Sequence, residues 1–299
     1  MTGNRPRAVL VGEAMLELSQ DGSGWQLGYG GDTLNTAIHL ARSGIDTAYL
    51  TALGTDPFSA DLKAQWAAEG LDTSLILSDP ARNPGLYAIT CDETGERSFT
   101  YWRGESAARG LFACDGIAAA ISAAEYADLL VFSLISLAIL PPEGRESLLA
   151  LARMVRRHGG FVAFDGNYRP RLWSNPQIAR AARDAAIAVA NIGLPTLEDE
   201  FMLSGASSAD EVAAHWQALG CSETIVKLGP AGCRLPDGRI IPPLRKLAPV
   251  DTSGAGDAFN AGYLEARLRG QLPETAAPAG HALAGWTIMR RGAIPARDS

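Results

Sequence analysis

Residues 250–263 read Val-Asp-Thr-Ser-Gly-Ala-Gly-Asp-Ala-Phe-Asn-Ala-Gly-Tyr, and this stretch decides what kind of fold the chain can adopt. Gly254 and Gly256 permit backbone angles closed to other residues, and the small residues after Asp257 let a helix pack closely on its neighbours. The stretch therefore predicts a loop that opens a helix. A helix N-terminus carries partial positive charge, which binds phosphate or stabilises charge that develops during transfer. We expect Asp257 at the mouth of this anion hole, where its carboxylate can accept a hydroxyl proton.

Length and composition are those of an ordinary globular protein. The 299 residues can form one large α/β domain or two small ones, and 47% hydrophobic with 20% charged residues predicts a soluble, ordered chain. The net charge is −7, and no run rich in Lys and Arg provides a nucleic-acid footprint. A bound nucleotide would therefore need local positive groups or helix N-termini, together with a metal ion.

The cysteines and the N-terminus indicate a cytoplasmic protein. Four widely spaced cysteines without a CxxC pair are too few for a disulfide framework, so we expect reduced thiols. Residues 1–7 are polar, and the apolar run after them is only a few residues long. The sequence thus predicts neither a signal peptide nor a membrane-spanning helix at this end.

Strands and helices are predicted to alternate along most of the chain. The opening pattern is strand, helix, strand, helix at residues 8–11, 33–42, 47–53 and 59–69, which favours right-handed crossovers and a parallel sheet. Further strands are expected at 129–133, 160–165 and 224–228, with helices at 143–158, 175–190, 198–205 and 208–220. No fixed repeat or low-complexity linker occurs, so residues 1–299 are expected to form one domain.

A different pattern, alternating rather than helical, occupies residues 83–103. Strands at 86–90 and 98–102, joined by residues 92–97, predict a hairpin. One face of it would carry Tyr87, Ile89, Phe99 and Tyr101. This is too much aromatic surface to leave in water, so we expect it to cover a pocket or a partner subunit.

Two arginines follow strand ends. Arg103 ends the hairpin, and Arg169 follows the strand that ends at Asp165. Ligands of open parallel sheets bind beyond the carboxyl ends of the strands, so the two guanidinium groups could hold a carboxylate there. The alternative is that each is a surface arginine with a local partner.

The order Asp-Thr-x-Gly-Ala-Gly-Asp-x-Phe at 251–259 resembles the C-terminal signature of the ribokinase-like (PfkB) carbohydrate kinases. The resemblance implies an α/β, three-layer fold with a mostly parallel central sheet flanked by helices. It also implies a small β-sheet lid formed by segments near 15–30 and 84–104. In that family the last aspartate of the signature is the catalytic base, which would be Asp257. The amides of Gly254, Ala255 and Gly256 would form the anion hole.

The same resemblance assigns the sugar site. Gly30, Gly31 and Asn35 match the Gly-Gly-x-x-x-Asn segment that binds sugar hydroxyls in the family. The stretches 12–18, 30–36, 51–56, 84–87, 101–103, 133–140 and 167–173 are together similar to one group of that family, the 2-keto-3-deoxygluconate kinases. Membership of this group implies that four residues surround a sugar acid, with arginines on its carboxylate and tyrosines on its carbonyl and hydroxyl end: Tyr87, Tyr101, Arg103 and Arg169.

The nucleotide side is also assigned by resemblance. Lys227, Gly229 and Gly232 resemble a turn that lies along ATP in the family, although an ordinary strand-turn-strand would look the same. His281 falls where the family's last helix lines the adenine pocket, whereas a lone histidine is more often packed or on the surface. The four histidines have no metal-ligand spacing, so no protein metal site is expected. Mg²⁺ would be held through water and ATP oxygens.

One stretch departs from the family pattern. Many relatives carry Asn-x-x-Glu before the segment that corresponds to 203–205, whereas this chain has Thr196 and Asp199 at those positions. The departure leaves open whether Asp199 helps to organise Mg²⁺. A monovalent-ion site near residues 291–293 is likewise a possibility that only the resemblance suggests.

The function predicted from these patterns is ATP-dependent phosphorylation of 2-keto-3-deoxygluconate at its 6-hydroxyl. A neutral-sugar kinase such as a fructokinase or ribokinase is one alternative, and the pair of arginines argues against it. A non-catalytic sugar-acid sensor is the other, and Asp257 with its glycine loop argues against that. We expect a small sugar acid and ATP as partners, and neither nucleic acid nor membrane. The apolar hairpin favours a homo-oligomer, and the preference between the gluconate and galactonate epimers stays open.

Overall fold

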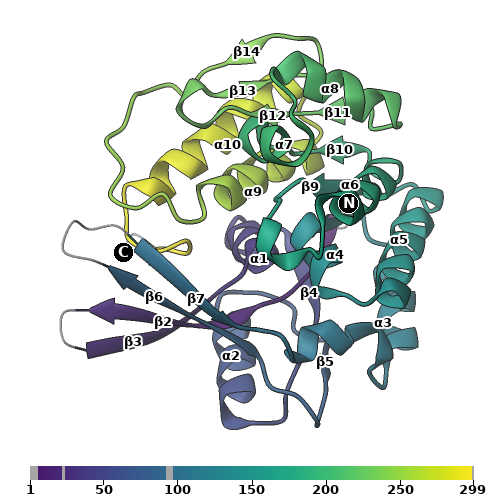
Figure 1. Ribbon diagram of the computed structural model, residues 1–299, viewed down its shortest axis with the longest axis vertical. Coiled ribbons are helices and arrows are strands. Elements are labelled where there is room, and N and C mark those ends of the chain that lie inside the picture. The colour runs from purple at the N-terminus through teal and green to yellow at the C-terminus, as the bar shows by residue number, and fades with distance from the viewer. Residues whose placement is uncertain (1–5, 22–23, 92–96, 298–299) are drawn as a thin grey trace, which may run out of the picture.

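The computed structural model describes residues 6–21, 24–91 and 97–297 (Figure 1). Seven parallel strands form the central sheet. Their spatial order is β11 (Glu223–Thr224), β10 (Ile192–Gly193), β9 (Phe161–Asp165), β8 (Leu129–Ser133), β1 (Arg7–Val11), β4 (Asp46–Leu53) and β5 (Ile76–Ser78). The parallel sheet predicted from the alternating pattern is confirmed.

Helices cover both faces of this sheet. Along β1, Val9 and Val11 point into one apolar core, and Ala8 and Leu10 point into the other, because successive strand residues face opposite sides. The first core is closed by η1 (Ala107–Ala113), α3 (Ile117–Ala124), α4 (Leu134–Ile139), α5 (Pro142–Arg157), α6 (Pro176–Ile187), α7 (Leu197–Ser204) and α8 (Ala209–Ala218). The second is closed by α1 (Asp32–Arg42), α2 (Pro57–Ala68), α9 (Ala255–Leu268) and α10 (Pro273–Ile288). The expected three-layer arrangement is confirmed.

A separate four-stranded sheet, hereafter the lid sheet, projects from the body beside the C-terminal helices (Figure 1). Its order is β3 (Gly24–Gly30), β2 (Met15–Asp21), β6 (Gly85–Cys91) and β7 (Arg97–Trp102). Tyr87 pairs with Tyr101, and Ile89 pairs with Phe99, so the predicted hairpin and its aromatic face are confirmed. Of the connection expected at 92–97, residues 92–96 lie outside the described residues.

The strand expected at 224–228 is divided between two sheets. Residues 223–224 belong to the central sheet, whereas β12 (Val226–Lys227) pairs with β13 (Cys233–Arg234), which pairs with β14 (Ile240–Ile241). The tight turn η3 (Gly229–Ala231) folds β13 back onto β12. Residues 225–227 still run parallel to the segment after β10, because the Ile225 and Lys227 amides donate to the Gly193 and Pro195 carbonyls, each at 2.8 Å. A short apolar run does not reveal which partner strand each of its halves will find.

Helix starts are fixed by caps that periodicity alone does not locate. The helix expected from residue 59 begins at Pro57, because Asp56 accepts a hydrogen bond from the Ser59 amide and proline suits the first helical position. Asn175 caps α6 in the same way through the Ile178 amide. In the described residues no single helix has the length and apolarity to cross a membrane, and one bent pair, 107–113 with 117–124, meets those criteria only when combined.

Candidate active site

The loop before α9 forms a helix N-terminus aimed into the cleft. Gly254 has φ 68°, and α9 begins at the next residue. A Cβ on Gly254 would lie 2.6 Å from the Ala293 side chain, so only glycine fits against the segment behind it. The Ala255 amide donates a long bond of 3.3 Å to the Thr252 carbonyl, and the first N–H groups of a helix have no partner within it. The arrangement therefore suits an anionic ligand at residues 254–257.

Asp257 lies in the first turn of that helix and contacts α1. Asn35 Nδ2 donates to its Oδ2 at 2.7 Å, and Thr36 Oγ1 donates to its backbone carbonyl at 3.2 Å. Burial, followed by the nearby Asp32 and Asp165 carboxylates, raises the pKa of Asp257 to about 8, while the hydrogen bond from Asn35 opposes the rise. A carboxyl group with such a pKa can take up and release a proton near neutral pH.

A buried polar cluster supports the base of α9. Lys227 Nζ donates to Asp165 Oδ1 at 3.2 Å and to Asn260 Oδ1 at 3.1 Å, and Asn260 Nδ2 donates to Asp165 Oδ2 at 2.8 Å. A Cβ on Gly256 would be 3.7 Å from Lys227 Nζ, so this ammonium lies directly beneath the anion hole. Sequence reasoning placed Lys227 along the nucleotide and did not identify Asp165 or Asn260, which nothing in their spacing connects.

Six of the residues predicted to bind the sugar form a continuous chain of contacts in the structure. They are Gly30, Gly31, Asn35, Tyr87, Tyr101 and Arg103. Tyr87 Oη lies over Gly30, where a Cβ would be 2.3 Å from it, and the Tyr87 and Tyr101 rings are 5.9 Å apart. The Arg103 guanidinium is 5.9 Å from the Tyr101 ring. Gly31 has φ 155° and leads into α1, with its carbonyl accepting from the Asn35 amide at 2.8 Å.

Each of the two predicted arginines is paired with a carboxylate of the protein. Arg103 forms an ion pair with the buried Glu13, which also accepts from Ser106 Oγ. Burial raises the pKa of Glu13, and the Arg103 charge opposes that rise. Arg169 Nη1 lies 3.3 Å from Asp199 Oδ1, and its side chain is 53% exposed. The sequence did not point to Glu13 as a partner, because the contact joins residues 90 positions apart.

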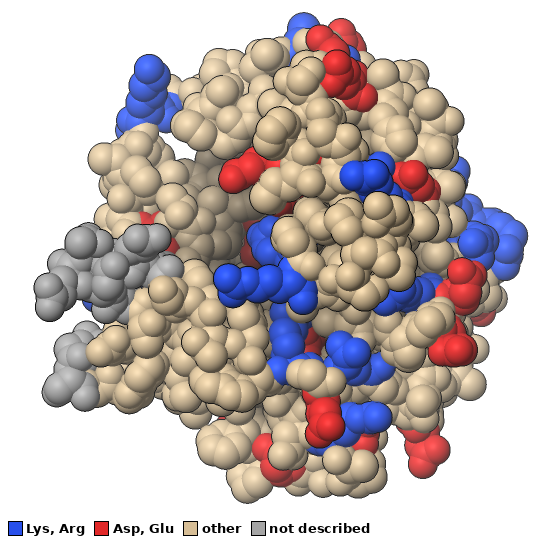
Figure 2. Space-filling model, viewed as in Figure 1, with Lys and Arg blue, Asp and Glu red and all other residues tan. Residues whose placement is uncertain are grey.

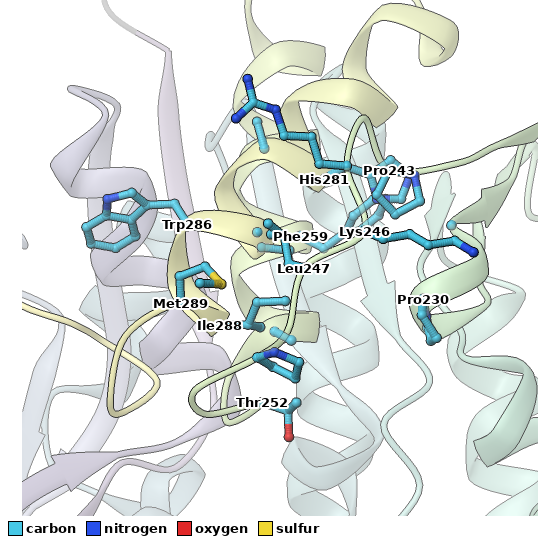
Figure 3. Close-up of a pocket in the computed structure, with 18 of the residues that line it drawn as sticks. Pro230, Pro243, Lys246, Leu247, Thr252, Phe259, His281, Trp286, Ile288 and Met289 are labelled. Atoms are coloured by element: carbon cyan, nitrogen blue, oxygen red, sulfur yellow. The ribbon is translucent and has the colours of Figure 1, made fainter.

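A cavity of about 1020 Å³ lies against the start of α9, where Thr252, Ala255 and Gly256 line it. Figure 3 shows Leu247, Phe259 and Ile288 within it. Lys227, Gly229, Gly232 and His281, all expected on the nucleotide, line it together with Gly256. The loop 243–249, with Arg245 and Lys246, also lines the cavity and was missed, because it carries no local motif. The volume and apolar walls suit a purine nucleotide.

His281 and Gly232 have structural contacts in this cavity. His281 Nε2 is 2.9 Å from the Ile241 carbonyl and 3.6 Å from Cys233 Sγ, and its ring is 5.1 Å from that of Phe259. Burial lowers the pKa of His281, so the neutral ring donates to the carbonyl. A Cβ on Gly232, at φ 104°, would be 2.1 Å from the same Ile241 carbonyl, which requires glycine.

The surface beside the lid sheet is hollowed (Figure 2). Acidic atoms are visible on the inner wall of the hollow, and Lys and Arg side chains gather next to it. The described residues contain no group of three or more His, Cys, Asp or Glu side chains that could hold a metal ion.

Known proteins resemble the chain over nearly its whole length. Residues 6–299 match the family described as pfkB family carbohydrate kinase. The 2-dehydro-3-deoxygluconokinase of Escherichia coli K12 is 42% identical over 304 residues, 98% of each chain, and that of Dickeya dadantii is 43% identical over 296 residues, 95% of each. A fructokinase structure from Vibrio cholerae, with fructose, ADP and potassium bound, superposes with a TM-score of 0.86 at 26% identity, over 98% of this chain and 96% of that one. The chain belongs to the pfkB family of carbohydrate kinases.

Proposed function

We propose that this kinase transfers the γ-phosphoryl group of ATP to the 6-hydroxyl of 2-keto-3-deoxygluconate, which is the same compound as 2-dehydro-3-deoxygluconate. The observation that carries the proposal is the position of Asp257. It lies at the N-terminus of α9, bonded to Asn35 on the sugar side and one residue from Gly256 on the nucleotide side. The identity of 37–43% to curated 2-dehydro-3-deoxygluconokinases supports the substrate.

The transfer step follows from this geometry. The hydroxyl oxygen forms a bond to the γ-phosphorus as the bond from that phosphorus to the bridging oxygen of ADP breaks. Asp257 accepts the hydroxyl proton, and the amides at the start of α9 stabilise charge on the moving phosphoryl group. The Lys227 ammonium beneath the loop adds positive potential at the same place.

Mg²⁺ is proposed to enter with ATP. Its chemistry there would be to neutralise charge on the phosphate oxygens. Asp165 is held by Lys227 and Asp199 by Arg169, so these two carboxylates suit such an ion as distant partners rather than as a cage. We propose that Asp199 reaches the hydrated ion only through water.

The sugar acid is proposed to lie beside Gly30 and Gly31, with its carboxylate toward Arg103. One Arg103 nitrogen is paired with Glu13, and its Nε has no partner in the described residues. A guanidinium has five N–H donors, so Arg103 retains donors for a ligand carboxylate. Arg169 is proposed as a second, more exposed contact that exchanges Asp199 for the substrate.

A coupled assay of ADP release tests the function. With Mg²⁺ and ATP, 2-keto-3-deoxygluconate should be turned over with the highest kcat/KM among that acid, 2-keto-3-deoxygalactonate, gluconate, fructose and ribose. Preference for fructose or ribose would overturn the substrate and keep the kinase. Binding of the acid without ADP release would instead indicate a sensor.

We further propose a cytoplasmic homo-oligomer that assembles through the outer face of the lid sheet. Trp25, Leu27 and Trp102 are 53%, 55% and 57% exposed there, on the face opposite Tyr87 and Tyr101. Apolar area of this kind is buried when subunits associate. Sedimentation analysis should find a dimer or larger species that Trp102→Glu shifts toward monomer, and a monomeric wild-type chain would contradict the proposal.

A further inference from the structure

Four residues that are paired across neighbouring strands form a row on the side of the lid sheet that faces the proposed sugar site. It consists of Gly28 on β3, Glu17 on β2, Tyr87 on β6 and Tyr101 on β7. The row faces the site because Tyr87 Oη lies over Gly30, which leads into α1. Glu17 is therefore a half-buried carboxylate on the same face as the proposed sugar contacts.

Space for a ligand remains next to this carboxylate. A Cβ on Gly28 would meet only Glu17 Cβ, at 4.0 Å, whereas the space over Gly30 is taken by Tyr87 Oη, 2.3 Å from the position of such a Cβ. Gly28, the neighbour of Glu17 in register, thus leaves the site side of Glu17 uncovered by a side chain of β3. A sugar bound beside Gly28 and Tyr87 would be within reach of Glu17.

The hydrogen bonds of Glu17 determine which ligand groups it can recognise. Tyr87 Oη donates to Glu17 Oε2, and Ser19 Oγ donates to Oε1. A phenol has one hydrogen, so while Tyr87 donates to Glu17 its oxygen can only accept from a ligand. The carboxylate oxygens are also acceptors. The pair consequently binds a hydroxyl group, which donates, and gives no hydrogen bond to a ketone or a carboxylate.

We propose that Glu17 is a specificity-determining residue that, with Tyr87, binds a secondary hydroxyl of the sugar acid, between its reacting carbon and its keto group. The inference rests on the proposed function and deepens it. It also changes the expected role of Tyr87, which binds hydroxyl rather than carbonyl. Because Glu17 is negative and Arg103 is positive, the substrate carboxylate is directed away from Glu17 and toward Arg103, which fixes the direction of the acid in the site.

Glu17→Gln tests the inference. The variant keeps the size of the side chain and removes its charge, so Kd for 2-keto-3-deoxygluconate without ATP, measured by calorimetry, should rise about 10–100-fold, as hydrogen bonds to charged groups predict. KM should rise by a similar factor and kcat should change less. The ratio of kcat/KM between this acid and its galactonate epimer should move toward one. Tyr87→Phe should give a comparable loss, and the double variant little more than either single one.

Thr100→Val is the matched control. Thr100 is exposed on the opposite face of β7, where its neighbour in register is Ala88, and the variant should keep wild-type Kd and epimer ratio. A Glu17→Gln enzyme with wild-type Kd and wild-type epimer ratio would overturn the inference. An equal loss on every sugar with an unchanged ratio would also overturn it, since that result marks a purely structural role.

The assay separates this inference from the proposed function. If the wild-type enzyme turns over the acid and the Glu17→Gln variant behaves like it, only the inference about Glu17 is rejected. Wild-type turnover of fructose in place of the acid would reject the proposed function, together with the idea that Glu17 directs a carboxylate. A loss of fructose affinity in Glu17→Gln would then support hydroxyl binding by itself.

Discussion

Asn35 Nδ2 and Asp257 Oδ2 are 2.7 Å apart, and this hydrogen bond joins α1 to the first turn of α9 across 222 residues of sequence. The bond fixes one carboxylate oxygen of Asp257, and the other is the oxygen proposed to accept the substrate's hydroxyl proton. It also favours the charged form of Asp257, against the burial that raises the pKa of that group. The proposed base is therefore oriented, and its pKa lowered, by a residue of the proposed sugar site.

Replacing the base should abolish most turnover. Asp257→Asn removes the proton acceptor and keeps the shape, so kcat should fall about 10²–10⁴-fold, the usual contribution of general base catalysis. ADP release under saturating sugar acid and ATP measures the effect. Near-normal kcat in a folded variant would show that Asp257 is not the base.

The same substitution should stabilise the protein in a pH-dependent way. The pKa of Asp257 is about 8 in the folded protein and ordinary when unfolded, so folding takes up a proton between these values and stability falls as pH rises through them. An asparagine side chain does not titrate, so the Tm of Asp257→Asn should exceed that of the wild type more at pH 8.5 than at pH 5. A Tm difference that is equal at both pH values would contradict the raised pKa.

Removing the Asn35 hydrogen bond should move the pH profile. That bond lowers the pKa of Asp257, so in Asn35→Leu the pKa rises further and the acid limb of kcat/KM shifts to higher pH. The position of the limb separates this effect from any loss of sugar affinity, which changes only the height of the profile. A limb that stays in place while activity falls would indicate a role in binding alone.

Removing only one partner of the buried Lys227–Asp165 ion pair should lower the stability of the fold. Lys227→Met leaves the Asp165 carboxylate buried without its cation and should destabilise the fold by about 3–5 kcal/mol. Lys227→Met with Asp165→Asn should recover much of that loss, because no charge is left unpaired. Urea unfolding measures both. Activity should stay low in the double variant, since the positive charge beneath Gly256 is gone.

Gly254 should tolerate no side chain. Gly254→Ala would combine a left-handed backbone with an overlap against Ala293, so it should cut kcat by displacing the amides of the anion hole. Gly270→Ala is the matched control, because Gly270 has φ 79° and open space around its Cα. The control should lose about 1–2 kcal/mol of stability and keep its kcat. Equal kcat values in both variants would show that the position of the anion-hole amides does not depend on glycine at residue 254.

Much of the fold was readable in the sequence because local rules determine it. The period of the apolar residues located most helices and strands, and the glycine loop with Asp257 marked the start of α9, since φ 68° at Gly254 needs glycine. The alternation at 86–90 and 98–102 predicted the hairpin and its aromatic face. These features depend on neighbours within a few residues, which a sequence displays directly.

Tertiary structure alone decided the contacts between distant residues. The sequence could not pair Glu13 with Arg103, set Lys227 beneath the anion hole, or bring Tyr87 to Glu17, because each contact depends on which strands lie side by side. It also could not divide residues 223–227 between two sheets. The residue types by themselves determined a kinase-like loop and the polar groups available to act with it. The packing of the two helical layers and the lid sheet decided which of those charges neutralise one another and which remain for a ligand.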